Sequence, residues 1–354
     1  SDHFGRKPLL SITVGIYALF TGLTGFVQNG WHLLVTRSLT GLGTGGELPV
    51  GVSAVTESTP SKWRGLAISI LIGAYPIGFL CAAWAALTLG VKFGWRSLFF
   101  LGIIPALLVI FIRKYMPESP KFANRKKADK KQVNIAQFVK SFALPFRYSQ
   151  KRSWAAMVTL FAFLFFWWGW ATWIPQFLVT EKGLGQIVGL QLVIIYSIVG
   201  FPAYFVAGYI SDYLGRKKTM ILFMIPAAIL LFFYVQQTTA ASLLTVGCFM
   251  SFFIFGGYGL GMGYPAEFFP AKIRATSYGV TSFFARIASG LSPFLIGFIS
   301  DRFSLAAGLP ILSGVFIVCA ILIYIMAPET AKEEIDQDAD ASIPTVGSGH
   351  TISQ

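Results

Sequence analysis

The sequence has little of what metal sites, disulfide frameworks and soluble surfaces need. Its 354 residues include only three cysteines and three histidines, and 12% are charged. The cysteines lie inside apolar stretches without paired spacing, which excludes a disulfide framework. The histidines are scattered at positions 3, 32 and 350, which excludes a histidine-based metal site. We therefore expect no metal, no cofactor and no metalloenzyme.

Long apolar stretches are abundant instead. Hydrophobic residues make up 55% of the chain and phenylalanine occurs 34 times, a composition too apolar for a soluble protein of this length. A helix needs about 20 apolar residues to cross a bilayer. Ten such stretches predict an all-α polytopic membrane protein: Pro8 to Gln28, Leu33 to Val55, Gly65 to Leu89, Ser97 to Ile112, Ser153 to Val179, Val188 to Ser211, Thr219 to Val235, Ala241 to Tyr264, Tyr278 to Ser300 and Leu305 to Met326.

The positive charge is distributed unevenly between the joints of these spans. The net charge is +13, and 22 of the 28 Lys and Arg residues lie in alternate joints, counted from a cytoplasmic first joint. The opposite joints hold only Lys92, Arg96, Lys182 and Arg302. This positive-inside pattern explains the charge by topology rather than by a nucleic-acid partner. We expect a multi-pass protein of the inner or plasma membrane, in contact with the lipid bilayer, with its long basic joint and C-terminus cytoplasmic.

One long joint divides the chain. Residues 113–152 hold 12 Lys and Arg residues and are predicted to form a basic cytoplasmic linker. The linker separates the spans of residues 1–112 from the six spans of residues 153–330. Residues 331–354 are polar and partly acidic, which predicts a disordered cytoplasmic tail.

The two halves repeat the same landmarks. Ser1-Asp2-x-x-Gly5-Arg6-Lys7 returns 210 residues later as Ser211-Asp212-x-x-Gly215-Arg216-Lys217. At the same displacement Glu57-x-x-Pro60-x-x-x-Arg64 returns as Glu267-x-x-Pro270-x-x-x-Arg274, and Pro117-Glu118-Ser119 returns as Pro328-Glu329-Thr330 one residue further on. These matches indicate a duplication. Because two spans precede the second Ser-Asp landmark and none precedes the first, we expect a twelve-span parent that lacks here its first two spans and its natural N-terminus.

Three charged residues, Arg37, Glu47 and Arg286, lie within predicted spans. A charge inside a membrane is costly, so each is a functional candidate. A desolvated carboxylate at Glu47 is a candidate carrier of a coupling proton, and a structural ion pair is the alternative. Each arginine is a candidate for binding a substrate carboxylate with its forked donors. Gly41-x-Gly43-x-x-Gly46 matches a dinucleotide fingerprint, but no strand precedes it, so close helix packing is the better interpretation.

An aromatic segment, FAFLFFWWGWATWIPQF at residues 161–177, suggests a binding surface. Trp170, Trp173 and Gln176 are spaced three apart, so they share a helix face and are candidates to line a solute cavity. Tyr258 would add a hydroxyl donor. The alternative is that the aromatic residues anchor the helix at the membrane interface or fill packing space.

The landmarks together resemble the major facilitator superfamily over essentially the whole chain. The superfamily's Asp-x-x-Gly-Arg-Arg/Lys signature matches residues 2–7 and 212–217, while Arg37-x-x-x-Gly41-x-Gly43-x-Gly45-Gly46 and Pro117 to Pro120 look like the sugar-porter and organic-acid-porter branches. Gly45 to Pro49 and Pro265 to Pro270 are most similar to bacterial niacin, aromatic-acid and metabolite:proton symporters. The resemblance implies a major facilitator fold with ten of its twelve transmembrane helices present.

The resemblance also implies a cytoplasmic gate. Opposite charges flank a turn that a glycine permits, and they can hold helix ends together while that side is closed. The contacts must break when the halves rock. The alternative is that the basic residues only enforce topology. The gate candidates are Asp2, Gly5, Arg6, Glu57, Arg64, Asp212, Gly215, Arg216, Glu267 and Arg274.

The expected function is transport without covalent chemistry, so the protein is not an enzyme. We expect a monomeric secondary transporter that moves a small organic acid, aromatic or short, together with a proton by alternating access. A sugar:proton symporter is the first alternative. A non-transporting sensor on the same fold is the second.

Overall fold

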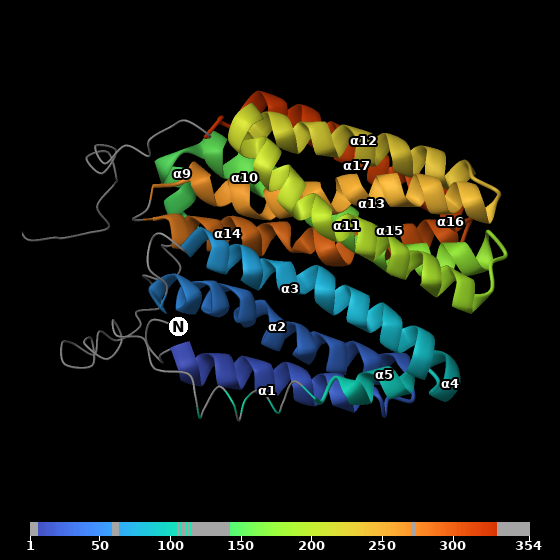
Figure 1. Cartoon of the computed structure of the whole chain (residues 1–354). Coiled ribbons are helices and arrows are strands. Elements are labelled where there is room, and N and C mark those ends of the chain that lie inside the picture. Colours follow the sequence, from blue (N-terminus) through green and yellow to red (C-terminus); the bar gives the residue numbers. More distant parts are fainter. Residues whose placement is uncertain are drawn as a thin grey trace, which may run out of the picture. The chain divides into compact units, whose positions relative to one another are not determined.

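The computed structural model describes residues 6–58, 64–104, 107, 109, 111, 114, 142–270 and 273–330. Within these ranges every regular element is a helix, which confirms the predicted all-α class (Figure 1). The chain divides into two compact units, Ser1–Val133 and Asn134–Gln354. The division falls within the predicted linker, whose residues 115–141 lie outside the described part, as does the predicted tail after Thr330. The two units are described separately.

The first unit is organised around the packing of two long helices. Its elements are α1 (Arg6–Thr24), α2 (Gly30–Ser58), α3 (Arg64–Ala85), the π-helical turn η2 (Ala86–Gly90), α4 (Val91–Phe93) and α5 (Arg96–Leu101). α1 packs along α2, and α5 packs against α1. A Cβ atom at Gly43 would lie 2.7 Å from the backbone nitrogen of Tyr17, so this glycine lets the two backbones approach. The interpretation of these glycines as sites of close helix packing therefore applies to Gly43. It does not apply to Gly41, where a Cβ would meet nothing within 4 Å.

The second unit contains six helical segments that are long and apolar enough to span a membrane. They begin at Gln150, Gln186, Arg216, Ala240, Thr276 and Leu305, close to the predicted starts. The four spans predicted for the first unit, and with them the total of ten, stay a prediction. The elements of the second unit are α9 (Leu144–Tyr148), α10 (Gln150–Thr180), α11 (Gln186–Leu214), α12 (Arg216–Gln236), α13 (Ala240–Gly263), η3 (Tyr264–Phe268), α14 (Arg274–Ala285), α15 (Ile287–Ser300), α16 (Leu305–Gly308) and α17 (Pro310–Met326).

The central helix of the second unit is α10, which packs against α13, α14, α15 and α17. Phe166 of α10 is fully buried, with its ring 4.4 Å from that of Phe316 on α17. Glycine makes room for such rings, since a Cβ at Gly261 would overlap the Phe163 ring at 2.0 Å. In lipid, helices associate through this kind of close packing because the acyl chains are as apolar as the side chains. The packing holds the helix ends, where the polar residues lie, in fixed positions.

Candidate functional site

A tight turn joins α11 to α12 at one end of the second unit. α11 ends at Leu214, Gly215 has φ of 100° and ψ of 151°, and α12 begins at Arg216. This backbone conformation is strained for any residue with a side chain. A Cβ at Gly215 would also lie 2.7 Å from a carboxylate oxygen of Glu329. Glycine is therefore required here both by the backbone angle and by the neighbouring carboxylate.

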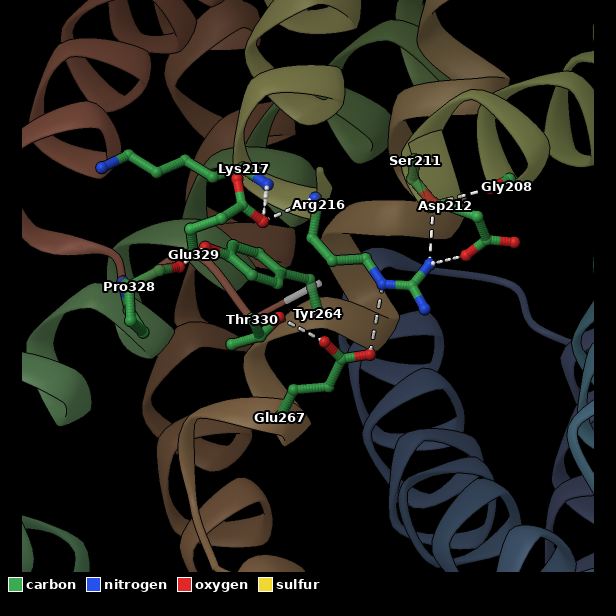
Figure 2. A network of polar contacts seen from close by, with 10 residues as sticks. All are labelled: Gly208, Ser211, Asp212, Arg216, Lys217, Tyr264, Glu267, Pro328, Glu329 and Thr330. Carbon is green, nitrogen blue, oxygen red and sulfur yellow. Dashed lines mark hydrogen bonds and ion pairs between the residues drawn. The ribbon is translucent and has the colours of Figure 1, made fainter. Parts of the chain in front are cut away.

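Arg216 is the centre of a polar cluster at this turn (Figure 2). Its Nη1 lies 2.9 Å from Oδ1 of Asp212 and donates to Oγ of Ser211 at 2.7 Å. Its Nε lies 3.5 Å from Oε1 of Glu267, which belongs to η3. The structure thus brings together Asp212, Arg216 and Glu267, three of the predicted gate residues, and their role as a gate stays a prediction.

The segment that follows α17 closes the cluster. Oε1 of Glu329 accepts the backbone N–H of Arg216 at 2.8 Å and that of Lys217 at 3.5 Å, so it caps the start of α12. Thr330 donates to Oε2 of Glu267, and the Tyr264 hydroxyl donates to the carbonyl of Pro328. We call Ser211, Asp212, Arg216, Glu267, Glu329 and Thr330 the Arg216 network.

Sequence reasoning did not assign Glu329 and Thr330 to the site, although it identified them as part of a repeated landmark. The signal was the return of Pro117-Glu118-Ser119 as Pro328-Glu329-Thr330 beside a returning Gly-Arg turn. Two landmarks that repeat together are expected to share a structural role in both copies. Here that role is a carboxylate cap on the helix that the glycine turn begins.

The ion pairs of the Arg216 network are partly open to solvent. The side chain of Arg216 is 30% exposed, and those of Asp212 and Glu267 are 64% and 34% exposed. An exposed pair such as Arg216–Asp212 contributes roughly 0–1 kcal/mol. The Arg216–Glu267 pair is half-buried, and the Nε atom of Arg216 in it is buried. The contact between Arg216 and Asp212 can therefore form and break at a modest cost.

The other gate candidates are placed less completely. Asp2 and Gly5 lie outside the described residues, and so do the side chains of Arg6, Glu57 and Arg64. Arg274 donates from Nε to the carbonyl of Phe269 at 3.1 Å, and no ion pair joins it to a described acidic residue. The predicted role of these residues stays a prediction.

The three candidates on α10 differ in their surroundings. Trp170 is 1% exposed and packs against Trp167 and Phe255 inside the bundle. The indole N–H of Trp173 donates to the carbonyl of Pro293 on α15 at 2.9 Å. Gln176 is exposed. The predicted common face therefore changes along its length from packed interior to open surface.

The remaining binding candidates also have distinct environments. Arg286 is exposed and is the single residue between α14 and α15, within one apolar segment, Thr276–Ser300, that is long enough to span a membrane. Tyr258 packs its ring against Trp167 with centroids 4.9 Å apart. In the first unit the guanidinium of Arg37 lies 5.7 Å from the centroid of the Phe99 ring. The side chain of Glu47 lies outside the described residues.

A second polar group, at the opposite end of the second unit, was not predicted. Glu181, just after α10, accepts the backbone N–H groups of Leu305 and Ala306 and so caps α16. Lys182 donates to the carbonyl of Val235 at 2.7 Å, near the end of α12. Burial lowers the pKa of Lys182, and the charge of Glu181 partly opposes that shift.

Two buried tyrosines lie next to this second group. The Tyr196 hydroxyl donates to the carbonyl of Leu243 at 2.9 Å, so the Tyr234 hydroxyl, 3.1 Å away, must donate to Tyr196. These bonds join α11, α12 and the start of α13. We call Glu181, Lys182, Tyr196 and Tyr234 the Glu181 group.

Comparisons with known proteins find a family, relatives and solved structures that this chain resembles. The model of the Major Facilitator Superfamily matches residues 1–204 and 186–348. The niacin transporter NiaP of Acinetobacter baylyi is 31% identical over 319 residues, covering 84% of this chain and 72% of that protein. The putative niacin/nicotinamide transporter NiaP of Bacillus subtilis is 28% identical over 340 residues, covering 95% and 83%. The crystal structure of a D-xylose-proton symporter superposes with a TM-score of 0.71 at 19% identity, covering 93% and 83%.

Proposed function

Because this chain belongs to the Major Facilitator Superfamily, we propose that it moves a small organic acid across the membrane together with a proton. It is a secondary transporter and not an enzyme. The finer assignment is supported by relatives of 31% and 28% identity that are named as niacin transporters. Niacin is an aromatic carboxylic acid, the class of solute that the sequence motifs favour.

The observation that carries the proposal is the position of Arg286. Its side chain is exposed at a helix junction inside an apolar span, and no described acidic residue forms an ion pair with it. A guanidinium without an ion-pair partner at this depth is costly unless it binds an anion for part of the transport cycle. A substrate carboxylate fits that requirement, whereas a neutral sugar would leave the charge uncompensated.

Further binding roles are proposed for residues on two neighbouring helices. The exposed amide of Gln176 on α10 and the half-buried ring of Tyr258 on α13 are suited to a polar contact and a ring contact with the solute. The buried Trp170 and the half-buried Trp173 are proposed to position α10 against its neighbours. Arg37 remains a candidate in the first unit.

Proton coupling is assigned to Glu47 because it is the one acidic residue well inside a predicted span. A carboxylate in a desolvated position binds a proton more readily than one in water. A structural ion pair is the alternative for this residue. Conversion of Glu47 to Gln distinguishes the two, because it abolishes acceleration by a pH gradient only if the residue carries the proton.

The Arg216 network is proposed as a reversible contact of the cytoplasmic side. Its ion pairs join α12 to α11 and η3, and the hydrogen bonds of Glu329 and Thr330 add the segment after α17. We place this end in the cytoplasm because the Lys and Arg residues concentrate there. A transporter of this family in a bacterial cell would lie in the inner membrane as a monomer.

Uptake by proteoliposomes tests the proposal. We expect radiolabelled nicotinate or benzoate to accumulate faster with an inward proton gradient than without one. Excess nicotinate should inhibit this uptake and excess glucose should not. The reverse pattern of inhibition would support the sugar alternative, and no flux of any acid or sugar would support the sensor.

Substitution of Arg286 tests its proposed contact with the substrate carboxylate. Arg286→Gln should raise the KM for nicotinate or benzoate by roughly 10- to 100-fold, the worth of a charged hydrogen bond. Arg286→Lys should recover part of the loss, because the charge remains and the fork is lost. Since the side chain is exposed, the thermal unfolding midpoint should not change. An unaltered KM in Arg286→Gln would contradict the proposed contact.

A further inference from the structure

The junction of α9 and α10 carries a basic and aromatic surface, of which only Arg274 is also a candidate for the cytoplasmic gate. α9 ends at Tyr148, Ser149 is extended, and α10 begins at Gln150, with Oγ of Ser149 accepting the backbone N–H of Arg152. Pro145 is buried, which fixes α9 against the bundle. We call this region the elbow surface, formed by Phe146, Arg147, Tyr148, Lys151, Arg152, Trp154 and Arg274.

Two of the four basic side chains of the elbow surface, those of Arg152 and Arg274, lie at one loop. Arg152 donates from Nη1 to the carbonyl of Phe268 at 3.2 Å, and Arg274 donates from Nε to the carbonyl of Phe269 at 3.1 Å. Because these carbonyls are consecutive, the two guanidinium groups lie at the same loop. Each of these hydrogen bonds uses one N–H of a group that has several.

No described acidic residue neutralises this charge. Arg147 and Lys151 are exposed and form no ion pair with the described part of the chain. The first turn of α10 contains no Asp or Glu. The nearest acid in sequence to the loop, Glu267, already contacts Arg216 and Thr330. The elbow surface therefore has a net positive charge that calls for an anion from outside.

Aromatic residues give the depth at which that anion would lie. Trp154 is 50% exposed and contacts Phe146 edge-on, with ring centroids 6.0 Å apart. Tyr148 lies 6.4 Å from Phe269. These rings are at the start of the first candidate span of this unit, Gln150–Thr180. Trp and Tyr at a span end, here the exposed Trp154 and the half-buried Tyr148, are typical of the headgroup level of a bilayer.

We propose that the elbow surface binds the phosphate group of an anionic phospholipid. Arg147 and Lys151 are the exposed contacts, Arg152 and Arg274 supply further positive charge from fixed positions, and Trp154 lies beside the lipid at headgroup depth. The exposed ring of Trp154 favours a lipid over a dissolved anion as the ligand, because half of this side chain would otherwise face water. The assignment does not depend on which solute is carried.

The test is lipid selectivity of the purified full chain. Native mass spectrometry in detergent would count dioleoylphosphatidylglycerol and dioleoylphosphatidylcholine adducts from an equimolar mixture. We expect a preference for phosphatidylglycerol in the unchanged chain. Arg147→Gln with Lys151→Gln should reduce that preference about 25-fold, roughly fivefold for each charge near the surface. Arg302→Gln with Lys92→Gln removes the same charge elsewhere and should leave it unchanged.

Four outcomes would overturn the proposal. The elbow variant could keep the phosphatidylglycerol preference, or the control variant could lose it equally. Soluble glycerol phosphate could displace the lipid at equal concentration, which would identify a site for a dissolved anion. Should the elbow variant fail to fold, Arg147→Lys with Lys151→Arg keeps both charges, and loss of selectivity in that folded variant would contradict the assignment.

Discussion

The two ends of the second unit are held together by different chemistry. At one end, the Arg216 network uses ion pairs between partly exposed groups, with separations of 2.9 and 3.5 Å. At the other end, the Glu181 group includes buried, uncharged hydroxyl bonds between Tyr196, Tyr234 and the carbonyl of Leu243. Both ends use a glutamate to cap a helix, Glu329 on α12 and Glu181 on α16.

The difference indicates which end is suited to repeated opening. Exposed ion pairs contribute little individually, and water can replace each partner. A buried hydroxyl that loses its partner has no water to bind and costs about 1–3 kcal/mol. The Arg216 network can therefore open during each transport cycle, whereas the Glu181 group is suited to holding α11, α12 and α13 in fixed register. Substitutions at each end test this contrast.

The largest effect is expected from the glycine turn. Gly215→Ala should lower the free energy of unfolding by about 2–3 kcal/mol, since its backbone angles suit only glycine and the new methyl group would displace Glu329. Gly183 also has a positive φ, 64°, but a Cβ there would meet nothing within 4 Å. Gly183→Ala should therefore cost about 1 kcal/mol. Equal losses in thermal unfolding would show that the carboxylate contact does not matter.

Removing the hydroxyl of Tyr196 should cost more stability than removing that of Tyr234. In Tyr196→Phe the Tyr234 hydroxyl loses its acceptor inside the bundle, which should cost about 1–2 kcal/mol. In Tyr234→Phe the Tyr196 hydroxyl keeps its bond to Leu243, so the loss should be smaller than about 1 kcal/mol. Denaturant unfolding in micelles measures both. The opposite order would mean that the hydrogen bonds are directed differently.

The two capping glutamates separate stability from transport. Glu329→Gln and Glu181→Gln each remove a charge from a helix start, so each should cost about 0.5–1 kcal/mol. Only Glu329→Gln is expected to change the initial uptake rate as well, because its helix start belongs to the Arg216 network. An equal change of uptake in both variants would place the moving contact elsewhere.

The smallest effect is expected from Asp212. Asp212→Asn removes one exposed ion pair with Arg216 and should cost less than about 1 kcal/mol. The uptake rate of the unchanged chain should respond to salt, since exposed charges are screened beyond about 8 Å at physiological ionic strength. This salt response should be weaker in Asp212→Asn. A full salt response in the variant would show that other charges determine it.

Much of the fold followed from the sequence because a membrane limits the choices. Backbone polar groups in lipid must be paired, so each apolar stretch of span length becomes a helix. The predicted stretch from Ser153 to Val179 corresponds to α10, Gln150–Thr180, and the predicted stretch from Leu305 to Met326 begins and ends as predicted. Charge pairing at Asp212, Arg216 and Glu267 was predictable for a related reason: the duplication marked these residues as repeated charges at span ends.

Other features required the tertiary structure. Sequence spacing put Trp170, Trp173 and Gln176 on one face, but only packing shows that Trp170 is buried and Gln176 exposed. The caps by Glu329 and Glu181 and the tyrosine pair join residues that are far apart in the chain. Composition and period determine that a helix forms and crosses the membrane, because those are local properties. Which side chains meet depends on how the helices pack against one another, and no local pattern records that.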